Sequence, residues 1–326
     1  MTTTATTTAT TTAQITPRGR FDLGQSITFG FGQRDAAELP DPAGPMRLGF
    51  VLDGYEEQVG VAVSQLSPGS LALEVTGACD LAAVRRQVAR VLSVDVDSTG
   101  WDQLGVEDPL IGALQRARPG LRPPLFYSAY EALAWAVLSA RRPRQQMSRV
   151  RSELSAAHGT TFEVAGRPMP VLPTPCQLLD VAEFPGLTPE KIERLHGVAR
   201  AALEGRLDTD ELRSLPVDEA TTRLRALAGI GPFYAELVIV RALGHTDVVP
   251  SSEPQLLALA GELLGTGRPL TAAELHDRTE QWRPWRTWAC VAIRAAGPLV
   301  LEQTGQPAQA SRASAPSSRA MSSSSV

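Results

Sequence analysis

The strongest structural signal in this sequence is Leu227-Ala228-Gly229-Ile230-Gly231-Pro232-Phe233-Tyr234-Ala235. The Gly-Ile-Gly turn and the apolar run from Phe233 to Val240 predict a helix, a tight turn and a second helix, because glycine alone adopts positive φ at little cost. Such a hairpin points the first backbone N–H groups of its second helix outward, where they can bind an anion such as a phosphate. The same pattern also fits an ordinary connector between two helices.

Composition limits the kinds of partner that this chain can bind. Its 326 residues are enough for two or three compact units, and 43% apolar with 20% charged residues is typical of globular proteins. The formal net charge of −4 argues against a protein that coats nucleic acid indiscriminately, since phosphate binding needs clustered Lys and Arg. A nucleic-acid site must therefore be a local patch.

Several classes of site are disfavoured by residue counts. Lys191 is the only lysine, which removes most candidates for a Schiff-base nucleophile. The three cysteines are scattered and lack ligand spacing, so we expect neither a disulfide framework nor a zinc site. No apolar segment has the length of a membrane span, and the Thr-rich start does not resemble a signal peptide. We therefore expect a protein of the cytoplasm that does not associate with membranes.

The first part of the chain has the pattern of an α+β domain. From Phe21 to about Gly77, short apolar runs alternate as half-buried strands do. Asp80 is expected to cap a helix that begins at Leu81. A small antiparallel sheet with one helix is predicted, its strands at 26–29, 47–52, 58–63 and 71–75.

After Pro109 the pattern becomes helical, and we expect an all-helical body. Both chain ends are too poor in apolar residues to offset the entropy cost of ordering, so we expect two disordered tails. The expected boundaries are 1–18 for the first tail, 19–105 for the α+β domain, 106–304 for the helical body and 305–326 for the second tail.

Two motifs in order resemble the bacterial 3-methyladenine DNA glycosylase II family, within the helix-hairpin-helix (HhH-GPD) base-excision DNA repair superfamily. They are Leu227-Ala228-Gly229-Ile230-Gly231 and Trp282-Arg283-Pro284-Trp285-Arg286-Thr287-Trp288-Ala289. The similarity runs through Phe162 to Gly205 by pattern and covers roughly residues 21–297. It implies an α+β fold with a two-lobed helical body, and a monomer that binds double-stranded DNA containing damaged bases in the bacterial cytoplasm, associated with the nucleoid.

The resemblance implies a monofunctional DNA N-glycosylase that hydrolyses the bond to an alkylated or otherwise damaged base. Such enzymes extrude the nucleotide into a pocket, where a carboxylate stabilises the oxocarbenium-like transition state. The family's aspartate is matched here by Glu253, whose carboxylate stands about 1.5 Å farther from the backbone. A displacement of that size can cost on the order of a hundredfold in rate.

Two alternatives stay open, one for the role of this carboxylate and one for the chain as a whole. Glu253 can be only a favourable charge at a helix N-terminus, in which case Asp247 is the second candidate. The chain as a whole can be a catalytically weak or inactive DNA-binding paralogue that retains the hairpin.

The implied base pocket contains Phe233, Tyr234, Leu237 and Arg294. Aromatic faces attract an electron-poor alkylated base through its cationic character, although aromatic residues that open a hairpin helix also serve as core. Leu237 matches a family tyrosine and Arg294 matches a tryptophan. The pocket is therefore expected to be less aromatic than is usual in the family.

The segment that enters the DNA is matched by Ala140, Arg141 and Arg142. Ala140 stands in the position of a glutamine, and Arg141 stands in the position of a bulky wedge residue. An arginine can fill the gap left by an extruded base, with its plane stacked on the neighbouring bases. The arginine-rich run that follows also fits a solvated helix face.

The remaining expected DNA contacts surround the hairpin. The amides of Gly229 and Gly231 are expected to approach a phosphate closely, and Arg283 and Arg286 to reach a phosphate beside them. The resemblance implies no cofactor for catalysis. It implies Na⁺ or K⁺ at the hairpin when DNA is bound, held by the backbone carbonyls of Arg225, Leu227 and Ile230.

We predict that borohydride traps no covalent complex between this protein and damaged DNA. Lyase members of the superfamily place a lysine where this hairpin has Phe233, so no amine stands there to form a Schiff base. The measurement is gel electrophoresis of the reaction after reduction, with a superfamily lyase as positive control. A trapped band for this protein would contradict the prediction.

Overall fold

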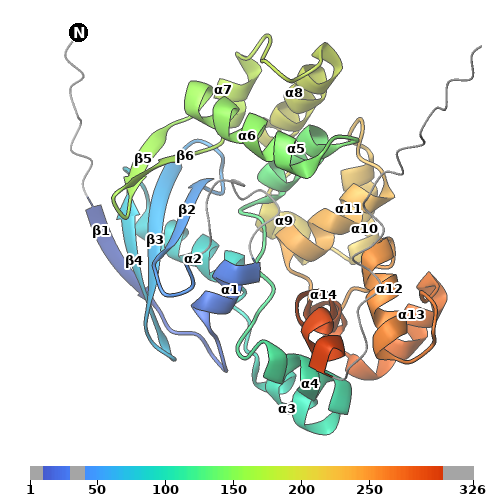
Figure 1. Ribbon diagram of the computed structural model, residues 1–326. Coiled ribbons are helices and arrows are strands. Elements are labelled where there is room, and N and C mark those ends of the chain that lie inside the picture. Colours follow the sequence, from blue (N-terminus) through green and yellow to red (C-terminus); the bar gives the residue numbers. More distant parts are fainter. Residues whose placement is uncertain (1–9, 30–40, 304–326) are drawn as a thin grey trace, which may run out of the picture.

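The computed structural model describes residues 10–29 and 41–303, so the expected tails lie outside the described residues at 1–9 and 305–326. A four-stranded antiparallel sheet forms one side of the molecule and helices form the other (Figure 1). The strand order is β1-β4-β3-β2. The strands are β1 (Thr10–Ile15), β2 (Met46–Val51), β3 (Gln58–Ser67) and β4 (Ser70–Thr76).

Helix α2 (Leu81–Val91) packs its apolar face on this sheet. Val84, Val88 and Val91 are buried against the apolar residues of β2, β3 and β4. The expected cap is confirmed, because the Asp80 carboxylate accepts the N–H of Ala82 at 2.8 Å. The three expected strands between residues 47 and 75 and the helix after them are therefore confirmed, and they form the first hydrophobic core.

Two expectations for the first thirty residues are wrong. Residues 10–15, expected in a disordered tail, form β1, which pairs with the edge of β4 and buries Ile15 opposite Leu71. A neighbouring strand supplies the hydrogen bonds that composition alone cannot reveal. The expected strand at 26–29 is instead part of α1 (Leu23–Phe29), which buries Leu23, Ser26 and Ile27 at helical spacing. Four residues are too few to distinguish the alternation of a strand from the 3.6-residue period of a helix.

The helical body folds around two further hydrophobic cores. None of its described helices is long and apolar enough to cross a membrane. Its helices are α3 (Thr99–Glu107), α4 (Pro109–Ala117), α5 (Ala129–Ser139), α6 (Arg144–His158), α7 (Pro175–Leu179), α8 (Pro189–Leu203), α9 (Thr209–Ser214), α10 (Val217–Arg225), α11 (Pro232–Val238), the π-helix η1 (Ile239–Leu243), α12 (Pro254–Leu263), α13 (Ala272–Thr279), the 3₁₀-helix η2 (Glu280–Trp282) and α14 (Arg286–Gln303).

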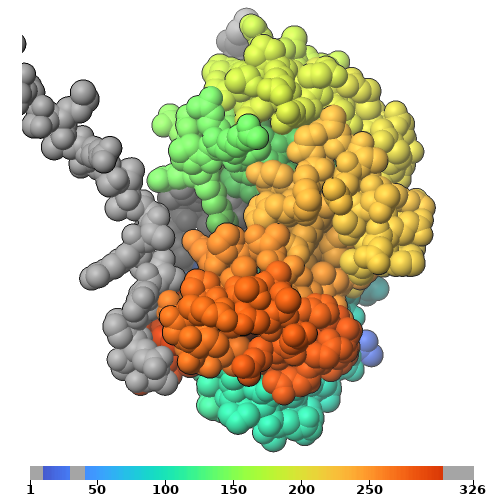
Figure 2. Space-filling model, turned by 90° about the vertical axis from the view of Figure 1, so that its right-hand side faces the viewer, coloured from blue at the N-terminus to red at the C-terminus, as the bar shows by residue number. Residues whose placement is uncertain are grey.

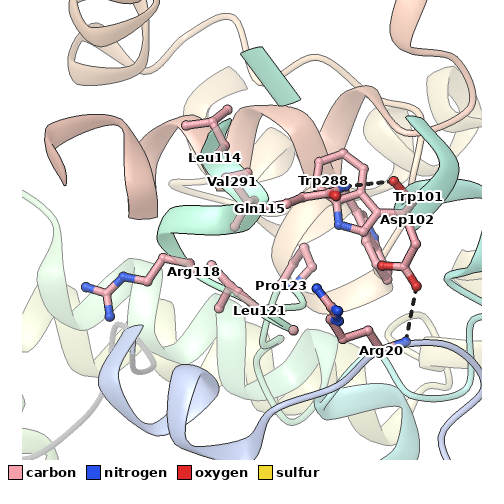
Figure 3. A pocket seen from close by; sticks show the side chains of 12 residues that line it. Arg20, Trp101, Asp102, Leu114, Gln115, Arg118, Leu121, Pro123, Trp288 and Val291 are labelled. Carbon is pink, nitrogen blue, oxygen red and sulfur yellow. Dashed lines mark hydrogen bonds between the residues drawn. The ribbon is translucent and has the colours of Figure 1, made fainter. Parts of the chain in front are cut away.

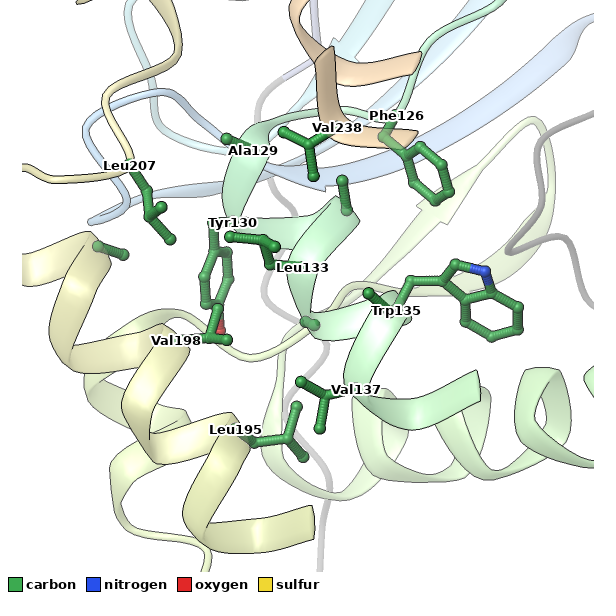
Figure 4. Packing of buried hydrophobic residues seen from close by; sticks show 14 of the residues in the cluster. Phe126, Ala129, Tyr130, Leu133, Trp135, Val137, Leu195, Val198, Leu207 and Val238 are labelled. Atoms are coloured by element: carbon green, nitrogen blue, oxygen red, sulfur yellow. The ribbon is translucent and has the colours of Figure 1, made fainter. Parts of the chain in front are cut away.

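Helix α5 is the centre of the first helical core. It is buried around its whole circumference, because neighbouring elements enclose it, and nearly all of its residues are apolar. Figure 4 shows Tyr130 and Val137 directed toward α8, where Val198 and Leu195 lie, whereas Trp135 points to the other side. Trp135 thereby faces the space between the two helical cores.

The second helical core combines distant parts of the chain. Trp101 of α3 packs against Trp285 and Trp288 at ring-centroid distances of 6.5 and 6.0 Å. The tryptophan stripe is thus core, as its spacing indicates. The expected domain boundary between residues 105 and 106 falls inside α3, whose residues pack with the last helices rather than with the sheet.

The expectation of an all-helical body after Pro109 is wrong at one place, a hairpin of β5 (Thr161–Val164) and β6 (Arg167–Pro170). It lies against the sheet where Gly49 of β2 and Gly60 of β3 are paired. A Cβ on Gly60 would stand 2.5 Å from the Val164 side chain, so glycine permits the close approach. These four-residue strands carry no periodicity that a sequence pattern can detect.

A buried ion pair joins the sheet to the first helical core. Glu131 of α5 is fully buried, and its two oxygens accept the N–H of Val51 at 3.0 Å and Nη2 of Arg151 at 2.9 Å. Burial raises the pKa of Glu131, while Arg151 opposes that rise. Arg151, one of the arginines after residue 140, therefore has a structural partner and is not part of a solvated face.

Candidate active site

The hairpin has the predicted geometry. Helix α10 ends at Arg225, the N–H of Ile230 returns to the carbonyl of Leu227 at 3.1 Å, and Pro232 is the first residue of α11. Gly229 has φ of +86°, where a side chain would be strained. No side chain caps α11, and the described residues leave the space beside Gly231 open. The first amides of α11 are therefore accessible.

Helix α11 continues as a π-helix that carries a partly buried arginine. Such segments often occur at functional sites. Arg241 of η1 donates from Nε and Nη2 to the carbonyl of Pro124 at 3.1 and 2.8 Å, and lies over the ring of Phe29. Burial, followed by the charge of Arg144, lowers the pKa of Arg241 to about 10. Arg241 thus remains positively charged at neutral pH.

A cavity of about 500 Å³ lies between the two helical cores. This volume is in the range of small-molecule sites, which runs from roughly 300 to 1,000 Å³. Figure 2 views the face on which the green segment of α5 and α6 meets the orange segment of α11 to α13. The lining residues are Phe29, Phe126, Trp135, Ser139, Arg142, Arg144, Phe233, Tyr234, Glu236, Leu237, Val240, Arg241, Pro250, Glu253, Cys290, Val291 and Arg294.

Glu253 lines this cavity together with Arg294. Glu253 immediately precedes α12, but its side chain makes no capping bond with that helix. Its Oε1 accepts instead from Nε of Arg294 at 2.6 Å, and the two side chains are 34% and 29% exposed. Nη2 of Arg294 donates to Oε1 of Gln255 at 2.5 Å. The carboxylate is therefore directed toward α14 and the cavity rather than toward its own helix.

Glu236 is a cavity residue that the sequence patterns did not identify. It lies on α11, and its carboxylate accepts the N–H of Ser251 at 3.0 Å and the N–H of Ser252 at 3.2 Å. It also accepts the Ser252 hydroxyl. A glutamate on a predicted helix gives no sequence signal of a bond to a loop fifteen residues later. The contact is visible only once the fold is known.

Asp247 anchors the start of the loop that leads to Glu253, and it does not line the cavity. It accepts Nε of Arg286 at 2.6 Å and also pairs with Arg283. Nη2 of Arg286 donates to the Asp247 carbonyl at 2.7 Å. Arg286 is only 6% exposed and Glu280 accepts a further bond from it, whereas Arg283 is exposed. These two arginines thus bind carboxylates of the protein.

The expected pocket residues Phe233, Tyr234 and Leu237 all line the cavity from α11. Phe233 is 46% exposed and meets Tyr234 edge to face at 5.3 Å between ring centroids. A large aromatic ring with that exposure is not core. The Phe233 ring is therefore free to receive a flat ligand.

Arg141 and Arg142 follow the end of α5. Both are exposed; Arg142 lines the cavity, and Arg141 has φ of +55°. The amine of Lys191 donates to the carbonyls of Val137 at 2.9 Å, Ala140 at 3.2 Å and Leu138. Sequence patterns gave no sign of this contact. The sole lysine therefore holds the end of α5 and the segment that carries the two arginines.

The three carbonyls of the implied cation site accept few hydrogen bonds within the protein. Among the described residues, no N–H or O–H donates to the carbonyls of Arg225 and Ile230, and only the Ile230 N–H donates to that of Leu227. Carbonyl oxygens are hard donors, and hard cations prefer such ligands. Elsewhere in the described chain, no group of three or more His, Cys, Asp or Glu could hold a metal ion.

A second cavity, shown in Figure 3, is unsuited to a ligand. Its volume of about 20 Å³ is that of a single water molecule. Gln115 donates to the Trp101 carbonyl at 2.7 Å and Asp102 accepts the N–H of Arg20 at 3.2 Å, so its polar groups are bonded to each other. The larger cavity is the candidate active site.

Comparisons with known proteins identify relatives, although no family model matches the chain. It is 26% identical over 204 residues to the DNA-3-methyladenine glycosylase of Bacillus subtilis (strain 168), covering 60% of this chain and 66% of that protein. It is 28% identical over 217 residues to a probable bifunctional transcriptional activator/DNA repair enzyme AlkA of Mycobacterium tuberculosis, covering 64% of this chain and 42% of that protein. The chain thus spans less than two thirds of either relative.

A solved structure, the 3-methyladenine DNA-glycosylase from Archaeoglobus fulgidus, has the same fold. The TM-score is 0.71 at 20% sequence identity, and the match covers 86% of this chain and 96% of that one. The predicted fold class, a small sheet with a helix followed by a two-lobed helical body, is thereby confirmed.

We predict that Arg286→Ala destabilises the fold and Arg283→Ala does not. Removing Arg286 leaves the Asp247 carboxylate and carbonyl without their buried donors, which costs about 2 kcal/mol or more. Arg283 is an exposed partner of the same carboxylate, so solvent screens this ion pair and its loss should leave the free energy of unfolding nearly unchanged. Urea unfolding of both variants measures the two changes in the free energy of unfolding. Equal decreases in the two variants would contradict the prediction.

Proposed function

We propose that this chain, a member of the bacterial 3-methyladenine DNA glycosylase II family, is a monofunctional DNA N-glycosylase. It releases alkylated or otherwise damaged bases by hydrolysis, in base-excision repair. The observation that carries the proposal is the Glu253 carboxylate in a cavity of about 500 Å³ that opens beside the hairpin. The names of the relatives from Bacillus subtilis and Mycobacterium tuberculosis support it.

The cavity has the size and the lining to receive an extruded base. Unstacking is easiest for damaged or mispaired bases, which is one source of selectivity. Phe233 and Tyr234 offer ring faces on which the base stacks, and Leu237 supplies an apolar contact beside them. Arg294 adds a guanidinium where the base or its sugar arrives.

The proposed reaction is hydrolysis of the N-glycosidic bond. As that bond breaks, positive charge develops on the sugar, and the Glu253 carboxylate stabilises it. Water attacks the anomeric carbon, its proton passes to the carboxylate, and the base leaves with the bonding electron pair and takes up a proton. Oε1 of Glu253 is held by Arg294, while Oε2 has no partner among the described residues. One oxygen is thus positioned and the other is available for chemistry.

We propose that the protein binds double-stranded DNA as a monomer, through residues that surround this cavity. The amides of Gly229 and Gly231 bind a phosphate, and Arg141 and Arg142 enter the duplex at the lesion. Arg283 reaches the backbone beside them. Arg286 is hydrogen-bonded to Asp247, so its contribution to DNA binding is indirect.

Na⁺ or K⁺ is proposed at the hairpin, with the carbonyls of Arg225, Leu227 and Ile230 as ligands. Bound there, the ion supplies positive charge to a DNA phosphate. Catalysis itself is proposed to need no cofactor, because the carboxylate and water suffice for hydrolysis. We place the activity in the cytoplasm, on nucleoid DNA.

We predict that Glu253→Gln abolishes base release while DNA binding persists. The neutral amide no longer stabilises the developing positive charge, so abasic-site formation in alkylated duplex DNA should fall on the order of a hundredfold or more. Glu262→Gln, the same change farther along α12 and outside the cavity, should release bases at the wild-type rate.

The measurement is the count of abasic sites with time, together with the affinity of each variant for undamaged duplex. If the wild type makes no more abasic sites than Glu253→Gln, Glu253 is not the catalytic group. If the wild type binds damaged DNA but releases no base, the chain is the DNA-binding paralogue instead, a reading to which the Glu253–Arg294 ion pair also lends support.

A further inference from the structure

Glu236 connects the hairpin helix to the loop that ends in Glu253. It lies one turn after Phe233 on α11, the helix that starts at the hairpin. Its carboxylate reaches the last residues before Glu253 and accepts three hydrogen bonds from Ser251 and Ser252. The hairpin and the segment bearing Glu253 are therefore held together by one side chain.

The bonding of the two carboxylates in the cavity assigns them different tasks. Oε1 of Glu236 accepts from the Ser251 amide, and Oε2 accepts from both the amide and the hydroxyl of Ser252. Glu253 uses only Oε1, toward Arg294. A carboxylate with both oxygens bonded to its own protein is suited to fix a backbone, whereas one with a free oxygen can serve the reaction.

The amides of Ser251 and Ser252 have few hydrogen-bond acceptors other than Glu236 among the described residues. Among the described contacts, the Ser251 N–H also approaches the Val249 carbonyl at 2.9 Å, but the Ser252 N–H has Glu236 alone, and Ser252 is exposed. Bonds to an ionised acceptor are roughly twice as strong as neutral ones. Without Glu236 these residues gain backbone freedom, because each freed residue regains conformational entropy.

We infer that Glu236 is a positioning residue that fixes the backbone of Ser251 and Ser252 and thereby sets the place of the Glu253 carboxylate. The inference rests on the proposed function, in which Glu253 is the catalytic carboxylate. Glutamate at 253 has a longer side chain than the family's aspartate, so the backbone that carries it must be held at a defined point. An error of about 1 Å there can cost on the order of a hundredfold in rate.

The first test is the single-turnover rate of base release from alkylated duplex DNA. Glu236→Ala should lower the rate on the order of a hundredfold, because the Glu253 carboxylate is misplaced. The affinity for DNA should not change, because the residues proposed to bind DNA are intact. Glu236→Gln keeps an oxygen acceptor for one amide and should lose about tenfold or less. Glu302→Ala, an exposed carboxylate at the end of α14, is the matched control and should behave as wild type.

The inference is overturned if Glu236→Gln is as inactive as Glu253→Gln, because Glu236 would then act as a carboxylate in the chemistry. It is also overturned if Glu236→Ala keeps the wild-type rate. Thermal unfolding of each variant identifies a loss that comes from misfolding, and in that case Glu236→Gln and the exchange measurement below carry the test.

Hydrogen exchange of the Ser251 and Ser252 amides, measured on the protein without DNA, separates this inference from the proposed function. Exchange at Ser252 should be slow in the wild type and at least tenfold faster in Glu236→Ala, since the one acceptor that the described residues offer its N–H is gone. Equal exchange in both proteins would refute the positioning role whatever the activity. Faster exchange in a protein that releases no base would uphold it and refute the glycosylase.

Discussion

The proposed function requires the loop from Asp247 to Glu253 to hold a carboxylate at one point, although loops are the most mobile parts of a protein. It is tied to the helices around it near both ends. Arg286 holds Asp247, and the Thr287 hydroxyl exchanges hydrogen bonds of 2.8 Å with the N–H and the carbonyl of Val248. Glu236 and Arg294 hold the other end. The loop is thus fixed between α11 and α14, and the site is as rigid as the packing of those helices.

Charge is arranged locally in a chain whose formal net charge is −4. Four arginines line the cavity beside two glutamates, and they are Arg142, Arg144, Arg241 and Arg294. If the proposed function is correct, this positive cavity attracts the DNA backbone even though the molecule as a whole is acidic. Arg294 is oriented by its bonds to Glu253 and Gln255, and on the same proposal it holds that orientation before DNA binds. The ion pair also joins the loop that bears Glu253 to α14.

Sequence patterns sufficed wherever a signal was long and periodic. The strands between residues 47 and 75, the cap at Asp80 and the hairpin at Gly229 were predicted because alternation, capping and glycine turns are local properties. Strand β1 was not, because its pairing partner β4 is distant in the chain, and the β5–β6 hairpin was not, because strands of four residues show no detectable period. Phe233 and Glu253 were proposed as site residues through the family resemblance, and both line the cavity. Glu236 and Lys191 were missed because their roles are hydrogen bonds to backbone, which leave no motif.

The most direct measurement is a crystal structure of the complex with duplex DNA that carries a cationic pyrrolidine in place of one sugar, since that ring mimics the charge of the transition state. We expect an oxygen of the Glu253 carboxylate at about 3 Å from the ring nitrogen, the distance of a charged hydrogen bond. Arg294 should still hold the other oxygen. A complex in which Asp247 or Glu236 contacts the nitrogen, or in which no carboxylate does, would contradict the role of Glu253.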